Sequence, residues 1–393
     1  MKSTVHPLAL ARGRRGVAVG AVLLTSLTLA ACSDSGAAEA PSPSGGSDAS
    51  AGTETSAELA KYLEPLDAYP VPTEPVDASS LEGKTVYYVP LTQQSPQFAV
   101  TGPAMTEALD AVGIKTQTCN GNATPTDISA CISQAVNAGA IAIVGDAISY
   151  AIASNAYDAA RAAGVPVIIG NQVPHADYPA DETLAYVEGA GSEMQVALAE
   201  WATADSGGTA NVLINQSMDG KTPGFYVADA LEKYEEVCPG CTITINEVTS
   251  ANFSLIPTST SSALLKDPNI DYVNSQFAQY LQPTQSGVEQ AGRTGKVKGM
   301  TGSVQLGGLQ ALASGTFLSA ATGQASAFQG WVYADAAMRM ALGTELPEYT
   351  VPVRLFTTDT IGDVELTEEA EASGEWFGPT TFTDDFTTLW GAQ

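Results

Sequence analysis

The chain has 393 residues and carries 43 acidic against 16 basic side chains, a formal net charge of −27. Such an excess of negative charge repels a phosphate backbone, so nucleic acid is excluded as a partner. There are two histidines, His6 and His175, and the motifs G-x-S-x-G and G-x-x-x-x-G-K-[ST] are absent from the sequence. The sequence predicts no multi-histidine metal site, no cofactor site and no nucleophile–base–orienter set. We therefore expect no catalytic residues and no enzyme activity.

The amino terminus has the pattern of a bacterial export signal. Three arginines precede an apolar stretch, Val17–Leu27, that is too short to span a bilayer comfortably, and Leu29-Ala30-Ala31-Cys32 forms a lipobox. This resembles the signal of bacterial surface lipoproteins, which implies removal of residues 1–31, acylation of Cys32 with chains such as palmitate, and anchoring on the extracytoplasmic face of the cell membrane. A plain secretory signal is the alternative, and Arg14-Arg15 leaves a twin-arginine route open.

Removal of the signal takes away Lys2 and three arginines but no acid, leaving 12 bases (16 minus 4) against 43 acids, a charge of −31. Solubility outside the cell or in salty surroundings accounts for this charge. Four further cysteines remain, an even number in an oxidising compartment. We predict disulfides between Cys119 and Cys131 and between Cys238 and Cys241; a redox-active pair at Cys238 and Cys241 and a four-thiolate zinc site are the alternatives.

Composition divides the remaining chain. Residues 32–56 are rich in Ser, Gly, Ala and Pro and lack large apolar side chains, which predicts a disordered tether. Residues 57–79 combine Tyr and Leu with several prolines and predict a short helix and an extended arm. Residues 358–393 are acidic and then aromatic, and we expect the aromatic side chains to pack on the body: Trp376, Phe377, Phe382, Phe386 and Trp390.

Two series of alternating strands and helices fill the centre of the chain. The first has apolar strands at residues 85–89, 114–118, 140–144 and 165–169, with helices beginning near Phe98, Thr126 and Ser149. The second has strands at residues 211–214, 242–248, 271–275 and 297–301, with helices beginning near Thr222, Ser259 and Gln279. The repetition of strand and helix predicts an α/β fold of two doubly wound parallel sheets, in two domains.

Several segments together resemble the type I periplasmic binding proteins, particularly the ribose-binding group. They include Ser95-Pro96-Gln97-Phe98, Ala163–Ile168, Ala251-Asn252-Phe253, Asp271–Phe277 and Gly299–Gly302. The resemblance spans residues 84 to about 356 and implies two Rossmann-like lobes, joined by a three-crossover hinge, with a solute held between them. It places an amino-terminal lobe at residues 80–187 plus 320–345 and a carboxy-terminal lobe at residues 188–319 plus 346–357.

Strand ends give an independent prediction of the same cleft, because ligands of parallel sheets bind at the carboxyl ends of strands. Those ends carry mainly amide, hydroxyl and aromatic groups, which suit a small neutral, sugar-like or hydroxylated solute. For each candidate residue, the alternative is that the side chain is solvated in a loop or packed in the core. The candidate ligand-binding residues are Gln94, Phe98, Asp146, Asn171, Gln172, Lys221, Phe253, Phe277, Thr301 and Gln305.

The chain departs from the ribose-binding pattern at the positions of its charges. Gly170-Asn171 replaces an Asp-Arg pair, Phe277 an asparagine and Thr301 an aspartate, and the arginine expected near Asp219–Thr222 is absent, with Lys221 the nearest base. Loss of charge-assisted hydrogen bonds argues against ribose itself. The resemblance implies a solute receptor for an ABC transporter permease; a ligand-sensing protein for a membrane receptor or kinase is the alternative.

Overall fold

The computed structural model describes residues 57–392, all of which belong to one compact unit, Gly52–Gln393. The predicted signal peptide, the lipidation site Cys32 and the tether lie outside the described residues. Within residues 57–392, no helix combines the length and the apolar character needed to cross a membrane.

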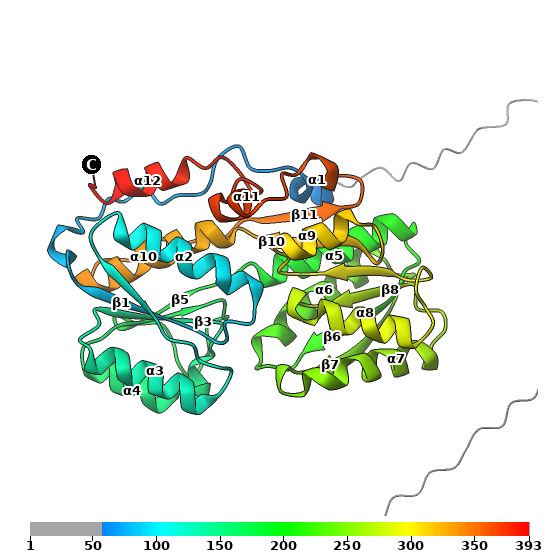
Figure 1. Ribbon diagram of the computed structural model, residues 1–393, viewed down its shortest axis with the longest axis horizontal. Helices are drawn as coiled ribbons and strands as arrows, with labels where there is room; N and C mark the ends of the chain where they lie inside the picture. The colour runs from blue at the N-terminus through cyan, green and yellow to red at the C-terminus, as the bar shows by residue number, and fades with distance from the viewer. Residues whose placement is uncertain (1–56, 393) are drawn as a thin grey trace, which may run out of the picture. The chain divides into compact units, whose positions relative to one another are not determined.

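The first lobe is built on a five-stranded sheet in which every pairing is parallel, in the order β2-β1-β3-β4-β5 (Figure 1). Apolar runs with β-branched residues form its central strands, and apart from Thr85 these residues are buried because helices cover both faces. The strands are β1 (Thr85–Pro90), β2 (Lys115–Thr118), β3 (Ala142–Asp146), β4 (Val167–Gly170) and β5 (Leu184–Val187). The intervening helices are α2 (Pro96–Asp110), α3 (Pro125–Asn137) and α4 (Ser154–Ala162), with η2 (Tyr150–Ile152) before α4.

The second lobe has a six-stranded sheet in the order β11-β10-β9-β8-β6-β7, parallel except for the pair β10 and β11. Its strands are β6 (Asn211–Ser217), β7 (Thr242–Val248), β8 (Tyr272–Ser275), β9 (Lys298–Thr301), β10 (Leu318–Gln324) and β11 (Val353–Thr357). Its helices are α5 (Gly191–Ser206), α6 (Thr222–Val237), α7 (Ile256–Lys266), α8 (Leu281–Gln290) and α9 (Leu306–Ala313), with η3 (Ser250–Leu255) and η4 (Ala278–Tyr280). The two parallel-sheet lobes predicted from the sequence are therefore confirmed.

The chain passes between the lobes three times: from β5 to α5, from β10 to α10 (Ser326–Leu342), and from α10 to β11. Helix α10 returns to the first lobe and packs closely on α2, where a Cβ on Gly330 would lie 2.6 Å from the carbonyl oxygen of Thr101. The expected lobe boundary after residue 319 falls inside β10. That strand continues to Gln324 because it pairs with β11 along that length, so residues 320–324 belong to the second sheet.

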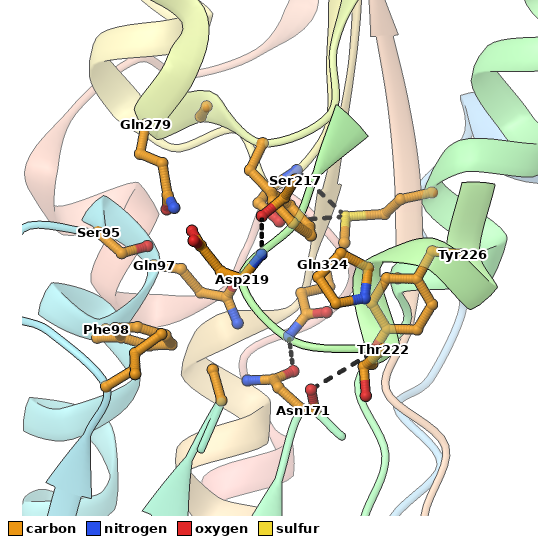
Figure 2. A pocket seen from close by; sticks show the side chains of 18 of the residues that line it. Ser95, Gln97, Phe98, Asn171, Ser217, Asp219, Thr222, Tyr226, Gln279 and Gln324 are labelled. Atoms are coloured by element: carbon orange, nitrogen blue, oxygen red, sulfur yellow. Dashed lines mark hydrogen bonds between the residues drawn. The ribbon is translucent and has the colours of Figure 1, made fainter. Parts of the chain in front are cut away.

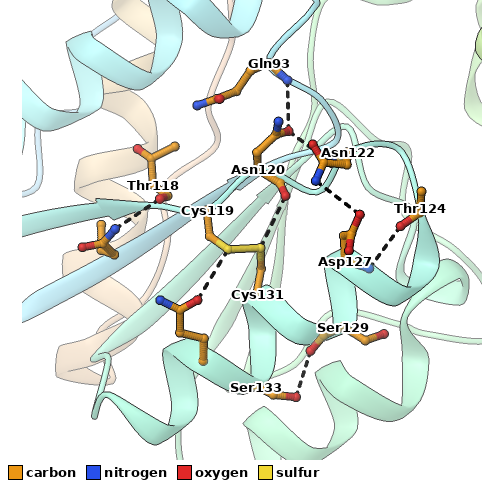
Figure 3. Close-up of a disulfide and its surroundings, with 12 residues drawn as sticks. Gln93, Thr118, Cys119, Asn120, Asn122, Thr124, Asp127, Ser129, Cys131 and Ser133 are labelled. Carbon is orange, nitrogen blue, oxygen red and sulfur yellow. Dashed lines mark hydrogen bonds between the residues drawn. A yellow bond between two sulfur atoms is a disulfide. The ribbon is translucent and has the colours of Figure 1, made fainter.

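Both predicted disulfides are present. Cys119 and Cys131, with Cα atoms 5.6 Å apart, join the segment after β2 to α3 (Figure 3). Cys238 and Cys241, 5.4 Å apart, close the Pro-Gly turn between α6 and β7. The first link fixes a loop beside the carboxyl end of β1, where Asn120 Oδ1 accepts a hydrogen bond from the Gln93 amide at 3.1 Å.

Residues 57–81 and 358–392 pair with each other and form what we call the arm–tail layer. The amide of Leu66 donates to the carbonyl of Phe377 at 2.8 Å, and that of Val76 to the carbonyl of Leu389 at 3.0 Å. The layer contains α1 (Ala57–Leu63), η1 (Ser79–Leu81), η5 (Ile361–Asp363), α11 (Glu368–Ser373) and α12 (Phe382–Leu389). In Figure 1 it runs along one side of both lobes, over α10 and β11.

The arm–tail layer makes side-chain contacts with both lobes. On the first lobe, the Trp390 indole N–H donates to Asp335 of α10 at 2.7 Å and its ring stacks on Trp331 at 5.5 Å. On the second lobe, Glu371 accepts a hydrogen bond from the Leu306 amide at 2.7 Å. All five aromatic side chains of the tail are buried: Trp376, Phe377, Phe382, Phe386 and Trp390.

Candidate functional site

A cavity of about 80 Å³ lies between the two lobes at the carboxyl ends of their strands. A volume of this size holds several water-sized groups and therefore suits a small molecule. Its wall combines aromatic and aliphatic side chains with amides and hydroxyls. The lining residues are Leu91, Thr92, Ser95, Pro96, Gln97, Phe98, Ala147, Asn171, Gln172, Gly191, Met194, Ser217, Asp219, Thr222, Pro223, Tyr226, Phe277, Ala278, Gln279, Ser303 and Gln324.

The start of α2 supplies the first-lobe wall. Pro96 is the first helical residue, where its missing N–H costs no hydrogen bond, and Ser95 is the N-cap. The Ser95 hydroxyl makes no capping hydrogen bond, so it stays free to face the cavity. One helical turn then places Gln97 and Phe98 on the same wall (Figure 2).

Asn171, at the end of β4, is the centre of a hydrogen-bonded group at the cavity floor. Its φ of +53° lies in the left-handed region, which Asn tolerates better than most residues. Its carboxamide oxygen accepts bonds from Gln324 and Gln329, each at 3.0 Å. Its amide nitrogen donates to Asp146 at 2.6 Å, so both polar atoms of this side chain are occupied.

Asp146 lies beneath the floor and is fully buried. Besides Asn171, its carboxylate accepts hydrogen bonds from the hydroxyls of Tyr88 at 2.7 Å and Tyr333 at 3.0 Å. Burial raises the pKa of this carboxyl above its ordinary value, although the three hydrogen bonds oppose the shift. Burial also raises the pKa of both tyrosine hydroxyls, with a further contribution from the neighbouring negative charge of Asp146, so they remain donors.

Two hydrogen bonds cross the cleft beside Asn171, and both come from α6. The Thr222 hydroxyl donates to Gln172 Oε1 at 2.8 Å, and the Tyr226 hydroxyl donates to the Asn171 carbonyl at 3.4 Å. Within the first lobe, Gln172 Nε2 donates to the same Asn171 carbonyl at 2.9 Å. At the hinge, Gln324 Oε1 accepts a bond from the Ala190 amide at 3.0 Å. We call Asn171, Gln172, Thr222 and Gln324 the bonded cluster.

The second-lobe wall is organised by the turn after β6. Asp219 Oδ2 accepts hydrogen bonds from the Ser250 hydroxyl at 2.6 Å, the Ser250 amide at 3.0 Å and the Tyr280 hydroxyl at 2.5 Å. Its Oδ1 accepts a bond from the Ser250 amide alone, at 3.1 Å. Burial raises the pKa of Tyr280 to about 12, and the charge of Asp219 adds to that shift. Phe277, just after β8, adds an aromatic face to the wall.

Ser95, Gln97, Asp219 and Gln279 keep hydrogen-bonding capacity that the described part of the chain does not use, as does the Thr92 hydroxyl, which accepts a bond from the Gln94 amide at 3.2 Å but donates none. Among residues 57–392, neither the Ser95 hydroxyl nor the Gln279 carboxamide has a side-chain hydrogen bond, and Gln97 Oε1 has no donor. Asp219 Oδ1 has one donor for its two lone pairs. We call Ser95, Gln97, Asp219 and Gln279 the open cluster. In Figure 2 Ser95 and Gln279 lie beside the Asp219 carboxylate, and the Gln97 carboxamide lies between that carboxylate and Asn171.

The structure brings four of the ten sequence-predicted binding residues together at the cavity: Phe98, Asn171, Gln172 and Phe277. Gln94 is exposed at the turn before α2, and Phe253 is 41% exposed and packs near Tyr280. Lys221 lines a separate cavity beside His175. Asp146, Thr301 and Gln305 are buried behind the wall, where Thr301 donates to the Ser275 carbonyl and Gln305 to the Ser326 hydroxyl.

Other lining residues are not among the ten candidates, although most lie in the strand-end loops that contain those candidates. Gln97 precedes Phe98, and Asp219, Ser217 and Ser303 lie in strand-end segments beside the chosen positions. Gln324 is the last residue of β10, a strand rich in small residues that the sequence analysis does not predict. In the described part of the chain, no three His, Cys, Asp or Glu side chains form a group that could hold a metal ion.

Residues 86–345 match the family described as periplasmic binding protein domain. No curated protein sequence matches the chain. A 5-methylthioribose transporter solute-binding protein from Thermotoga lettingae is similar in structure, with a TM-score of 0.66, 16% identity, and 82% of this chain and 100% of that chain covered.

Two further solved structures share the fold. The D-allose-bound periplasmic solute-binding protein of an ABC transporter from Actinobacillus succinogenes has a TM-score of 0.62 and 15% identity, over 72% of this chain and 100% of that chain. The Caulobacter myo-inositol binding protein has a TM-score of 0.62 and 17% identity, over 71% and 95%. The family match over residues 86–345, together with two parallel-sheet lobes and a cavity between them, shows that this chain belongs to the periplasmic binding protein family.

Proposed function

We propose that this protein is an extracytoplasmic solute-binding lipoprotein that captures a small, neutral, sugar-like or hydroxylated solute and delivers it to the permease of an ABC importer. The observation that supports the proposal is the partly enclosed cavity between the lobes, with Phe98 and Phe277 in a wall of amides and hydroxyls. Aromatic faces cover C–H surface, and amides both donate and accept, so together they suit a hydroxylated ring. The structurally similar proteins named above bind D-allose, 5-methylthioribose and myo-inositol.

Capture would proceed by closure of the lobes over the solute. The bonds from Thr222 and Tyr226 to the first lobe are made only when the lobes are together, so they stabilise the closed state. The absence of a nucleophile–base pair among the described lining residues favours binding over catalysis.

Isothermal titration calorimetry with D-allose, myo-inositol and 5-methylthioribose, followed by a wider set of neutral polyols, tests the solute class. We expect at least one compound to bind with 1:1 stoichiometry. The variant Ala278→Trp, which fills the cavity, should abolish that heat, whereas the surface variant Gln285→Ala should retain it. Binding that survives Ala278→Trp would place the solute elsewhere and contradict the proposal.

The lipid anchor at Cys32 is a separate part of the proposal and rests on the lipobox. Growth with a clickable palmitate analogue should label the wild-type protein. The variant Cys32→Ser should lack the label and keep an uncleaved signal or pass into the medium. Retention on membranes, after a detergent-free wash, of an unlabelled Cys32→Ser protein from which the signal has been removed would contradict anchoring through this residue.

A further inference from the structure

The cavity has an unbalanced charge. Asp219 is the one charged side chain among the described residues that line it, and no lysine or arginine in residues 57–392 lies within ion-pair distance of Asp219 or of Asp146 beneath the floor. Lys221, the nearest base in sequence, lines the separate cavity beyond the Thr222–Gln172 bond. Charges interact more strongly in such a partly enclosed site than in water, so the cavity disfavours anions.

The unused hydrogen-bonding capacity is concentrated at the same place. Asp219 Oδ1 and Gln97 Oε1 can only accept, whereas Ser95 and Gln279 can both donate and accept. Acceptors therefore outnumber donors in the open cluster. Because unpaired polar groups in a closed site are costly, a bound solute that satisfies this cluster must bring donors to it.

The open cluster also spans both lobes. Ser95 and Gln97 come from the start of α2 in the first lobe, while Asp219 and Gln279 follow β6 and β8 in the second. A solute group that bonds to both pairs links the lobes and favours closure. Recognition at this end is thus coupled to the conformational change that the proposed function requires.

We infer that the open cluster determines specificity by accepting two adjacent hydrogen-bond donors of the solute, from a vicinal diol or a protonated amine, and that Asp219 excludes anionic solutes. This inference rests on the proposed function, because it names the part of the solute that the cavity recognises. Phe98 and Phe277 take the apolar surface of the solute, and the bonded cluster holds the floor in place.

Calorimetry on the detergent-solubilised full-length protein tests the inference with D-allose, myo-inositol, D-glucose, D-glucosamine and D-glucuronate. We expect binding of neutral or amine-bearing compounds and no heat with D-glucuronate. Asp219→Asn should weaken the tightest interaction about ten- to a hundredfold, the value of a hydrogen bond to a charged group. A larger loss for D-glucosamine than for D-glucose identifies an amine as the donor, and equal losses identify a diol.

Gln279→Ala keeps the test valid if Asp219→Asn disturbs the bonds to Ser250 and Tyr280. Gln279 makes no side-chain hydrogen bond within residues 57–392, so its truncation should leave the melting temperature unchanged and weaken binding about two- to tenfold. Asp384→Asn on α12 is the charge-matched control and should bind as the wild type does.

Three results decide between the hypotheses. Affinity within twofold of wild type in both Asp219→Asn and Gln279→Ala would overturn the inference but leave the proposed function intact. Binding of D-glucuronate in preference to D-glucose would overturn it as well. A lack of binding by every neutral and amine-bearing compound would instead contradict the proposed function itself.

Discussion

The bonded cluster and the open cluster line the same cavity but use their polar atoms differently. Asn171, Gln172 and Gln324 have their carboxamides occupied by other protein groups, whereas Gln279 has no such partner in the described structure. A lining amide therefore does not by itself indicate a ligand contact. The number of its hydrogen bonds already made within the protein is the better criterion.

The difference has a structural origin. The bonded cluster surrounds the crossovers, where Gln324 and Asn171 connect β10 and β4, and a hinge needs defined geometry. The open cluster lies at a helix start and at two turns, which face each other across the cleft without direct hydrogen bonds. We therefore expect substitutions of the bonded-cluster carboxamides, and of Asp146 that accepts a hydrogen bond from Asn171, to change mainly stability. Substitution of Thr222, whose bond crosses the cleft, should act through closure, and substitutions in the open cluster should change mainly affinity.

The largest effect is expected for Asp146→Ala. The change leaves the buried hydroxyls of Tyr88 and Tyr333 and the Asn171 amide without their acceptor, and each lost bond costs about 1 kcal/mol or more. The free energy of unfolding from urea titration should fall by about 3 kcal/mol. Gln279→Ala, the matched truncation in the open cluster, should stay within about 0.5 kcal/mol of wild type. Similar losses in the two variants would remove the distinction between the clusters.

Phe277→Ala should weaken solute binding by about 1.5 to 3 kcal/mol, the value of burying such a side chain, or roughly ten- to a hundredfold in affinity. Phe253→Ala is the aromatic control, because Phe253 does not line the cavity. Calorimetry with the bound compound compares them. If Phe277→Ala binds as tightly as wild type while its melting temperature falls sharply, Phe277 is a core residue and its assignment to the site is wrong.

Thr222→Val should weaken solute binding about fivefold and leave the stability of the first lobe unchanged. The variant removes the donor to Gln172 across the cleft, a bond worth about 1 kcal/mol in the closed state. Small-angle scattering of the ligand-free protein should show a larger radius of gyration, while Thr242→Val on exposed β7 should not. An unchanged radius together with unchanged affinity would show that this bond does not hold the lobes together.

The smallest expected effect is a pH dependence of the Asp146 contribution. Since the folded-state pKa of Asp146 is raised, the folded protein takes up this proton at higher pH than the unfolded chain, whose value is 3.8. The wild type should therefore gain stability relative to Asp146→Ala as pH falls from 7 toward 4. Urea titrations of both proteins at several pH values check the sign, since other acids cancel in the difference. A gain in the opposite direction would show that the hydrogen bonds outweigh burial.

The sequence predicted most of the sheet framework, because buried apolar runs such as Val86–Val89 and Val167–Ile169 are strong strand signals. Three strands are not predicted: β5, β10 and β11. β5 has only four residues, and β10 contains Ala and Gly, which are depleted in strands. Their neighbours in the sheet, rather than their own composition, make them strands.

The site was predicted to the level of the loop but not of the side chain. The strand-end argument selects Asn171 and Phe277, which line the cavity, but it also selects Gln94, whereas Gln97, three residues later, is the lining residue. The direction of a loop side chain depends on local turns and on partners distant in sequence, such as Ser250 for Asp219. A single sequence does not specify those pairings.

The arm–tail layer has a consequence for the order in which the chain folds. The backbone bond between Val76 and Leu389 joins residues 313 positions apart, and Trp390 contacts Trp331 and Asp335 in the middle of α10. Contacts between such distant positions require closure of very long loops and are slow to form. The first lobe thus completes its packing only after residues 376–390 are available to it, and a chain truncated at residue 345 would leave Phe328 and Trp331 without these aromatic partners, as apolar surfaces prone to aggregation.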